Sequence, residues 1–461
     1  MSKKHIISLL VCIIMLVGIV AGCSSKTSTD SNTNSNEPDV TTPAEQNDET
    51  NETADETSDT PAEPVTVSLL IDNQAELSGI EAVIDAIEEK FNISTEIDLR
   101  PGGDESDNVV KTRLATGDMA DLCFYNSGSL FMALNPPEHF VDLTDEPYMD
   151  TIDESFKLTV TVDGRVYGIP SGTAIAGAWL YNKKIYEELG LSIPKTWEQL
   201  MDNCEQIKEA GITPVLASYR DSWTAQLILL ADYYNVHAQL PTFAEDYTAN
   251  KAKFSTTPIA LRGFEKLQEV HTRGFLNQDF LATTYEDALK MLAEGEGAHY
   301  PMLSFALPVI AENYPDKIDD IGLFAQPGDS EDTYGLTVWM PGGVYLNKHS
   351  EHVDALKKWA EFYVSREGID VYMSAQKPQG PFAIKGIELP DDVWPAVKDT
   401  TAYFDAGNTA PALEFISPLK GPNLPQICVE VGSGITSPKA GAEAYDADVE
   451  KQAKQLNLPG W

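Results

Sequence analysis

The chain is poor in cysteine, histidine and basic side chains. Its 461 residues include five Cys and seven His, and only 32 Lys and Arg stand against 72 Asp and Glu, which gives a formal net charge of −40. A protein this acidic lacks the basic surface that nucleic acid and anionic lipid require, so we expect no nucleic-acid partner. We expect the acidic surface to be solvated and self-repelling.

Sequence motifs for catalysis and for metal binding are also missing. The chain has no His-Glu-x-x-His, no Gly-x-Ser-x-Gly and no phosphate-binding loop. With so many carboxylates, a pair of them at glycosidase spacing carries no information by itself. His349 and His352 are three residues apart, but we interpret them as exposed residues at the start of a helix. The sequence therefore predicts no enzyme, no cofactor and no metal site.

The cysteines do not form a disulfide pattern. Cys12 and Cys23 lie near the N-terminus, and Cys123, Cys204 and Cys428 are an odd number without short spacings. A fold of this size does not need disulfides, and Cys204 falls on the apolar face of a predicted helix. We expect the last three cysteines to be structural thiols.

The N-terminus has the pattern of an export signal. Two lysines precede an apolar run over residues 6–20, which ends at Ala21-Gly22-Cys23. The run is shorter than the roughly 20 residues that a bilayer requires, so it predicts a cleaved signal rather than a spanning helix. Because Cys23 follows the small residues, residues 1–23 resemble a lipoprotein signal peptide, which implies lipidation of Cys23. The alternative is an ordinary signal peptide with an incidental Cys.

Residues 24–64 form a separate region of low complexity. They contain eleven carboxylates, one Lys and almost no large apolar side chain. Such a segment buries too little apolar surface to offset the entropy of ordering. We interpret it as a disordered, acidic tether rich in Ser, Thr and Asn.

The rest of the chain alternates between predicted strands and helices. Residues 65–71, 95–99 and 122–125 have the pattern of buried strands, and helices are predicted between them from apolar residues at helical spacing. A second series begins with a strand at 178–181 and includes a helix opened by the capping box Thr196/Gln199. This alternation predicts an α/β fold with mostly parallel sheets, in which ligands bind at the carboxyl ends of strands.

A series of short motifs in fixed order identifies a family. They are Gly117-Asp118-Met119-Ala120-Asp121, Val141-Asp142-Leu143-Thr144, Tyr167-Gly168-Ile169-Pro170, Leu180-Tyr181-Asn182-Lys183, Pro194-Lys195-Thr196-Trp197, Gly211-Ile212-Thr213-Pro214 and Gly342-Gly343-Val344-Tyr345-Leu346-Asn347-Lys348. With these motifs the chain resembles the family 1 extracellular solute-binding proteins, which are carbohydrate receptors of bacterial ABC importers. Ala120 replaces the family's usual Pro. We interpret the motifs themselves as scaffold and assign them no role in binding.

The resemblance implies a two-lobed, type II periplasmic-binding-protein-like fold. Each lobe would be a mostly parallel sheet flanked by helices, with a hinge cleft between the lobes. By analogy, the N-terminal lobe would combine residues 65–170 with about 320–385. The C-terminal lobe would combine residues 171–319 with about 386–461.

Sugar recognition requires aromatic faces and planar polar side chains, and the predicted strand ends offer both. The candidate ligand-binding residues are Asp72, Gln74, Glu76, Tyr125, Asn126, Ser127, Thr173, Arg220, Asp221, Trp223, Tyr300, Phe305, Trp339 and Gln379. Several have a structural alternative: Trp223 could cap the helix that follows it, and Trp339 could be a core residue. Arg220 could pair with Asp221 instead of a ligand. Trp179 is predicted to be core.

The expected function is capture of a carbohydrate, an oligosaccharide or a monosaccharide, by lobe closure. The receptor would be a monomer on the outer face of the bacterial cell membrane, anchored through Cys23, and would deliver its ligand to the transmembrane subunits of an ABC permease. Two alternatives remain: a sugar-sensing receptor for a membrane kinase, and an exported enzyme acting on polysaccharide.

Overall fold

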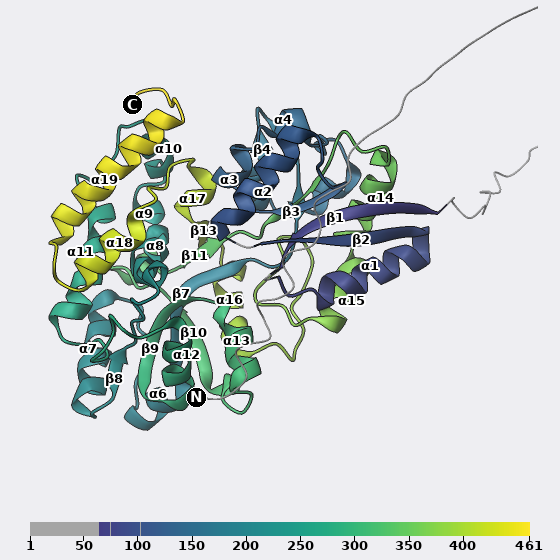
Figure 1. Ribbon diagram of the computed structural model, residues 1–461. Helices are drawn as coiled ribbons and strands as arrows, with labels where there is room; N and C mark the ends of the chain where they lie inside the picture. The colour runs from purple at the N-terminus through teal and green to yellow at the C-terminus, as the bar shows by residue number, and fades with distance from the viewer. Residues whose placement is uncertain (1–63, 74, 102) are drawn as a thin grey trace, which may run out of the picture. The chain divides into compact units, whose positions relative to one another are not determined.

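The computed structural model describes residues 64–73, 75–101 and 103–461. The predicted signal peptide 1–23, with Cys23, and the predicted tether up to residue 63 lie outside the described residues, as does Gln74. Two main sheets organise the described part of the chain (Figure 1). No helix in this part of the chain combines the length and apolar character needed to cross a membrane.

The first sheet has five strands in the order β2-β1-β3-β12-β6. They are β1 (Val65–Asp72), β2 (Ile93–Arg100), β3 (Leu122–Tyr125), β6 (Ile169–Pro170) and β12 (Gly343–Leu346). β1 pairs in parallel with both β2 and β3, as the sequence predicts, whereas β12 is antiparallel to β3 and β6. A short hairpin of β4 (Thr161–Val162) and β5 (Arg165–Val166) lies apart from it.

Helices pack on the first sheet through apolar faces. The main helices are α1 (Ser78–Phe91), α2 (Gly103–Thr116), α14 (Val353–Tyr363) and α15 (Arg366–Ala375), and shorter ones are α3 (Ser129–Met132), α4 (Pro136–His139), η1 (Pro147–Thr151) and α5 (Glu154–Thr159). α1 buries Ile80, Val83, Ile84 and Ile87, which confirms the predicted face. α15 lies beside α1, although nearly 300 residues separate them in sequence (Figure 1).

The second sheet is built around the long strand β7 (Ile175–Asn182). Its other strands are β8 (Thr213–Val215), β9 (Gly297–Leu303), β10 (Ile321–Ala325), β11 (Leu336–Trp339) and β13 (Thr409–Pro411). β9, β10 and β11 all run antiparallel to β7. Only the β8–β9 and β11–β13 pairs are parallel. The expectation of a mostly parallel sheet is therefore wrong here, because strands buried on both faces carry no sequence signal for their direction.

Helices surround the second sheet, and they include the predicted helix that begins after Thr196. They are α6 (Lys183–Leu189), α7 (Trp197–Glu209), η2 (Ser222–Gln226), α8 (Leu227–Ala231), α9 (Tyr233–Gln239), α10 (Phe243–Thr248), α11 (Pro258–Thr272), α12 (Tyr285–Glu294), α13 (Ala306–Asn313), η3 (Ile318–Asp320), η4 (Glu331–Thr333), α16 (Pro395–Asp405), α17 (Leu413–Ile416), α18 (Leu424–Gly432) and α19 (Pro438–Gln455). The segment from Ser222 to Gln239 is divided among η2, α8 and α9.

The family motifs act as scaffold in the ways their chemistry suggests. Asn182 caps α6 by accepting hydrogen bonds from the backbone N–H groups of Lys184 and Ile185. Thr196 and Gln199 form the predicted capping box of α7. The carboxylate of Asp121 accepts hydrogen bonds from Ser68 and Ser350, at 2.8 Å and 2.5 Å from their hydroxyl oxygens.

The hydrophobic cores divide the chain between the two sheets. One core draws its buried residues from 67–169 and 344–384, and the cores on the two faces of the second sheet draw theirs from 174–340 and 393–453. Residues 321–339 therefore belong with the second sheet, although the sequence predicts them in the N-terminal lobe. The reason is that β10 and β11 pair with β7. Cys123, Cys204 and Cys428 are buried free thiols.

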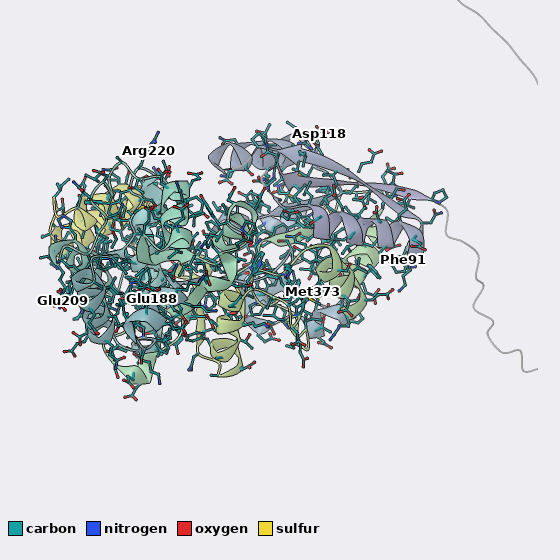
Figure 2. All side chains as sticks on the ribbon, turned by 90° about the horizontal axis from the view of Figure 1, so that it is seen from below. Phe91, Asp118, Glu188, Glu209, Arg220 and Met373 are labelled. Atoms are coloured by element: carbon teal, nitrogen blue, oxygen red, sulfur yellow. The ribbon has the colours of Figure 1, made fainter. Side chains whose placement is uncertain are left out.

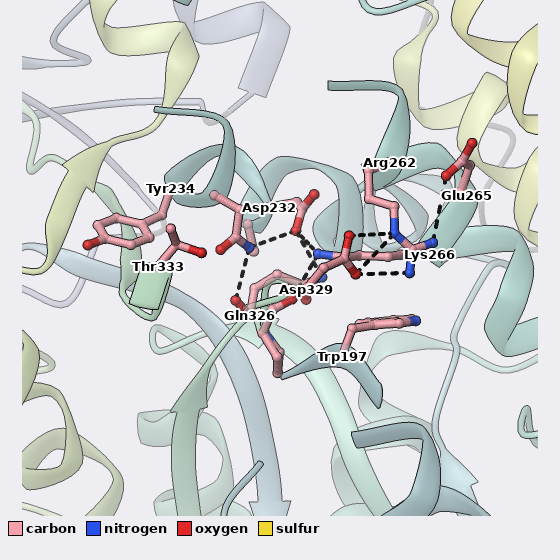
Figure 3. Close-up of polar contacts among 12 residues, drawn as sticks. Trp197, Asp232, Tyr234, Arg262, Glu265, Lys266, Gln326, Asp329 and Thr333 are labelled. Atoms are coloured by element: carbon pink, nitrogen blue, oxygen red, sulfur yellow. Dashed lines mark hydrogen bonds and ion pairs between the residues drawn. The ribbon is translucent and has the colours of Figure 1, made fainter. Parts of the chain in front are cut away.

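The second lobe also contains a buried ion pair (Figure 3). Lys266 Nζ lies 2.5 Å from Asp232 Oδ1, and both side chains are at most 2% exposed. Lys266 also donates to the carbonyl of Pro327 at 2.8 Å and lies 5.4 Å from the ring centroid of Trp197. Asn235 donates to Asp232 Oδ1 at 2.9 Å. This network ties α9, α11 and the exit of β10 together.

Candidate ligand-binding cleft

A cleft of about 520 Å³ lies between the edges of the two sheets. On one side it is lined by residues at or just after the ends of β1, β2 and β3, together with the segment before β12. On the other side lie the start of β7, the end of β9 with the residues after it, and the end of β11. Nine of the fourteen predicted site residues line this cleft: Asp72, Glu76, Tyr125, Asn126, Ser127, Thr173, Phe305, Trp339 and Gln379.

Strand register explains why these residues meet. In the first sheet Asp72 pairs with Arg100, and Gly343 pairs with both Tyr125 and Pro170, so the three parallel strands end where β12 begins. In the second sheet Trp339 pairs with Ile175. Since β9 and β11 both run against β7, their ends lie beside its start.

The first-sheet side of the cleft is organised by Arg100, whose side chain is 5% exposed. Its Nη1 lies 3.2 Å from Asp72 Oδ2 and also bonds the hydroxyl of Ser106, and its Nη2 donates to the carbonyl of Phe124 at 2.7 Å. The guanidinium lies 5.7 Å from the ring centroid of Tyr125. These contacts fix Asp72 and Tyr125 at the edge of the cleft.

Tyr125 and Ser127 are held by further hydrogen bonds. The hydroxyl of Tyr125 donates to Asp107 Oδ1 at 2.6 Å, and burial together with this bond raises its pKa. Ser127 donates to the carbonyl of Pro341 at 2.8 Å. Asn126, between them, is exposed and lines the cleft, so its side chain is open to solvent there.

Close backbone approach requires glycine on this side. A Cβ at Gly342 would lie 2.7 Å from the carbonyl oxygen of Tyr125 and 3.1 Å from the hydroxyl of Ser171. Any larger residue would therefore displace the floor of the cleft. Glycine at this position therefore allows the segment before β12 to pass close to the end of β3.

The second-sheet side is mainly aromatic and apolar. It is lined by Leu303, Phe305, Trp339, Met340 and Phe415. The indole N–H of Trp339 donates to Glu414 Oε1 at 2.7 Å. Phe305 packs on Trp223, with ring centroids 6.0 Å apart. Half-buried aromatic rings of this kind present apolar faces to a ligand.

Four predicted site residues do not line the cleft. Arg220 points outward from the surface (Figure 2), and Asp221 accepts a hydrogen bond from the backbone N–H of Tyr285 at 2.7 Å. Trp223 packs behind Phe305 and against Tyr285. Tyr300 is 1% exposed and bonds Ser218, with 2.6 Å between the hydroxyl oxygens. β8 is the edge strand, so its exit loop lies beyond the cleft, and Tyr300 lies inside β9 rather than at its end.

Several other residues that line the cleft are not among the candidates predicted from the sequence. Arg100 is the last residue of β2, so the strand-end rule itself could have found it. Tyr372, Gln376 and Phe415 belong to α15, α17 or the residue after α15, and no strand end marks these segments. Across the described residues, no group of three or more His, Cys, Asp or Glu side chains is placed to hold a metal ion.

Comparison with known proteins agrees with the fold. The model of the bacterial extracellular solute-binding protein family matches residues 72–369, which is more than half of the chain. The chain belongs to this family. The prediction made from the short motifs is therefore confirmed, and the members that it resembles are solute-binding proteins rather than enzymes.

The individual relatives have low sequence identity to this chain, but the matched regions are long. The multiple sugar-binding protein of Streptococcus mutans is 25% identical over 293 residues, which is 61% of this chain and 67% of that protein. An uncharacterized ABC transporter extracellular-binding protein of Pyrococcus horikoshii is 24% identical over 62% of this chain and 65% of its own length. The chain thus spans about two thirds of these relatives. A solved structure of the solute-binding protein RafE in complex with raffinose has a TM-score of 0.68 and 20% identity, covering 84% of this chain and all of that one.

Proposed function

We propose that this solute-binding protein captures a carbohydrate, an oligosaccharide, in the cleft and delivers it to the transmembrane subunits of an ABC importer. One observation carries the proposal: a single cleft combines hydrogen-bonding side chains on one side with aromatic side chains on the other. Pyranose rings offer both kinds of surface, since paired hydroxyls surround an apolar C–H patch. The names of the relatives, a multiple sugar-binding protein and a raffinose complex, support the same ligand class.

The site residues follow from this division. Asp72, Glu76, Asn126 and Gln379 would bind hydroxyl groups, since they line the cleft and carry carboxylate or amide groups. Trp339 and Phe305 would stack on sugar rings. Arg100 would hold Asp72 and Tyr125 in position rather than bind the sugar directly, because its guanidinium is already hydrogen-bonded to protein groups.

The mechanism is a shift in population rather than a reaction. One lobe combines residues 65–170 with 343–385 and the other combines residues 174–340 with 389–461, which follows the division of the hydrophobic cores. A sugar that contacts both lobes binds the closed form more tightly and shifts the equilibrium toward it. No residue forms or breaks a covalent bond in this scheme, so the protein would not be an enzyme.

Export and anchoring belong to the same proposal. The apolar run before Ala21-Gly22-Cys23 supports cleavage before Cys23 and lipidation of its thiol. The mature protein would then be a monomer tethered to the outer face of the cell membrane. Mass spectrometry of the N-terminal peptide from the membrane fraction tests this, with Cys23→Ala as the variant that should be released.

Ligand class is tested by thermal shift with a panel of oligosaccharides and monosaccharides that includes raffinose. A ligand that binds only the folded state stabilises it by about 2.7 kcal/mol at a 100-fold excess over Kd. We expect at least one sugar to raise the Tm. A rise with amino acids, polyamines or glycerol phosphates, and with no sugar, would refute the carbohydrate assignment.

A further inference from the structure

Trp339 is held in the cleft by contacts from two directions. It is the last residue of β11, and a Cβ at Gly177 on β7 would lie 2.2 Å from Cζ3 of its ring. The indole therefore rests directly against the backbone of Gly177. Its N–H donates to Glu414 Oε1 at 2.7 Å, so the edge of the ring is fixed as well.

Glu414 is itself held by a second partner. Its Oε2 pairs with Lys420 Nζ, and the two side chains are 19% and 32% exposed. Because one carboxylate oxygen accepts from the indole and the other faces the ammonium, Glu414 cannot rotate without losing a charge-assisted bond. The pair lies on α17 and the loop after it, in a segment that also places Phe415 in the cleft.

We propose that Glu414 is a positioning residue that, together with Lys420, orients the indole of Trp339 for stacking on the ligand. This inference rests on the proposed function, since it assumes that a sugar ring is the partner of Trp339. A planar ring contributes most to binding when its orientation is set before the ligand arrives. Its side chain then loses no further conformational entropy when the complex forms. Glu414 would thus affect affinity without touching the ligand.

The test is a double-mutant cycle on the whole protein. Affinity for the sugar identified by the thermal-shift panel is measured by calorimetry for the wild type, Glu414→Ala, Trp339→Phe and the double variant. We expect Glu414→Ala to weaken binding about tenfold in the wild type and by less than twofold when residue 339 is Phe, which has no N–H to orient. Equal losses in both backgrounds would overturn the proposal, as would no loss in either.

Conservative variants separate orientation from folding. Glu414→Gln keeps an acceptor for the indole N–H, so we expect binding within threefold of the wild type. Lys420→Met releases the second oxygen and should give an intermediate loss. Glu450→Ala is the matched control, because Glu450 on α19 also pairs with a lysine, Lys454, but does not line the cleft. A Glu414→Gln variant as weak as Glu414→Ala would contradict a role in orienting the ring.

A measurement on the ligand-free protein distinguishes failure of the positioning role from failure of the proposed carbohydrate ligand. The near-ultraviolet circular dichroism of the ligand-free protein, with the Trp339→Phe spectrum subtracted, reports the indole directly. We expect Glu414→Ala to reduce this difference signal and Glu450→Ala to leave it unchanged. If no sugar binds the wild type but the signal still falls, the ligand class is wrong and the positioning role stands. An unchanged signal would refute the positioning role.

Discussion

The two sides of the cleft are built by different sheets and offer different chemistry. On the first side, three parallel strands end together and present side chains that are hydrogen-bonded to one another, with Arg100 at the centre. On the second side, antiparallel neighbours of β7 end beside its start and present Phe305 and Trp339. The polar side is thus fixed by its own network, whereas the aromatic side depends on packing and on one hydrogen bond to Glu414.

Parallel and antiparallel neighbours bring different ends of a strand to the cleft. Where neighbouring strands are parallel, all their carboxyl ends reach one edge, and residues that follow them gather there. Where the central strand runs against its neighbours, its amino end lies at the cleft instead. Position within the sheet matters as well, because the exit of an edge strand such as β8 lies outside the site.

The largest expected effect is on stability, and it is confined to the second lobe. Lys266→Met removes one partner of the buried ion pair and leaves the charge of Asp232 without it. Breaking such a pair costs about 3–5 kcal/mol of unfolding free energy. Urea unfolding measured by circular dichroism should show this loss, while the sugar affinity of the folded variant stays within twofold, since neither residue lines the cleft.

Lys454→Met is the matched control for that experiment, because Lys454 belongs to an exposed pair on α19. Exposed pairs contribute between 0 and about 1 kcal/mol. A loss of similar size in the two variants would contradict the importance assigned to the buried network.

Acid should weaken the second lobe through His299, which is buried in β9. Its Nδ1 lies 2.7 Å from the carbonyl oxygen of Pro214 and its Nε2 2.7 Å from the hydroxyl of Tyr186, so the neutral ring donates to Pro214 and accepts from Tyr186. Burial lowers the pKa of His299 to about 4, against 6.5 for a free imidazole. The stability it contributes is complete above pH 6.5 and is lost as pH falls toward 4, because the unfolded chain binds the proton first. The loss should approach about 3 kcal/mol.

Unfolding free energies at pH 7 and pH 4.5 measure this effect. The difference should be smaller in His299→Gln than in the wild type, and unchanged in His349→Gln, whose imidazole is exposed in the first lobe. An equal pH dependence in all three proteins would show that His299 does not titrate between the two states.

A smaller effect is expected on sugar affinity, and it should differ between aromatic residues that line the cleft and those that pack behind them. Trp339→Ala should weaken sugar binding by about 2 kcal/mol, or roughly 30-fold, as expected for a well-packed aromatic contact. Trp223→Ala should change affinity less than threefold, because Trp223 supports Phe305 and does not line the cleft. Calorimetry measures the affinity of both variants. A greater loss for Trp223→Ala than for Trp339→Ala would contradict the placing of Trp339 in the binding site and of Trp223 behind it.

The smallest effect is expected on the polar side. Asn126→Ala removes an exposed amide that lines the cleft and should cost about 1 kcal/mol of binding, or roughly fivefold, with no change in Tm. Asn313→Ala is the control, since Asn313 is exposed on α13 away from the cleft. Equal affinities for the two variants would remove Asn126 from the proposed site.

Much of the fold could be predicted because its local signals are strong. The capping box at Thr196 and Gln199 and the apolar face of α1 lie where the sequence predicts them. Strand direction in the second sheet could not be predicted, because nearly every residue of β7 and all of β9 are buried, and such runs read the same in either direction. For the same reason the sequence did not reveal that β10 and β11 pair with β7, and residues 321–339 were predicted in the wrong lobe.

The site divides in the same way. Residues at the ends of β1 and β3 could be found because parallel strands share an edge, and Arg100 at the end of β2 obeys the same rule. Phe415, Tyr372 and Gln376 reach the cleft from helical segments distant in sequence, and only tertiary packing brings them there. Sequence position alone does not reveal such contacts.

The most direct measurement is a crystal structure of the protein with the tightest-binding oligosaccharide of the panel. The account predicts a sugar ring against the indole of Trp339, with hydroxyl groups within hydrogen-bond distance of side chains on the first-sheet side, such as Asp72 or Asn126. A sugar bound outside the cleft, or inside it without contact to Trp339, would contradict the account.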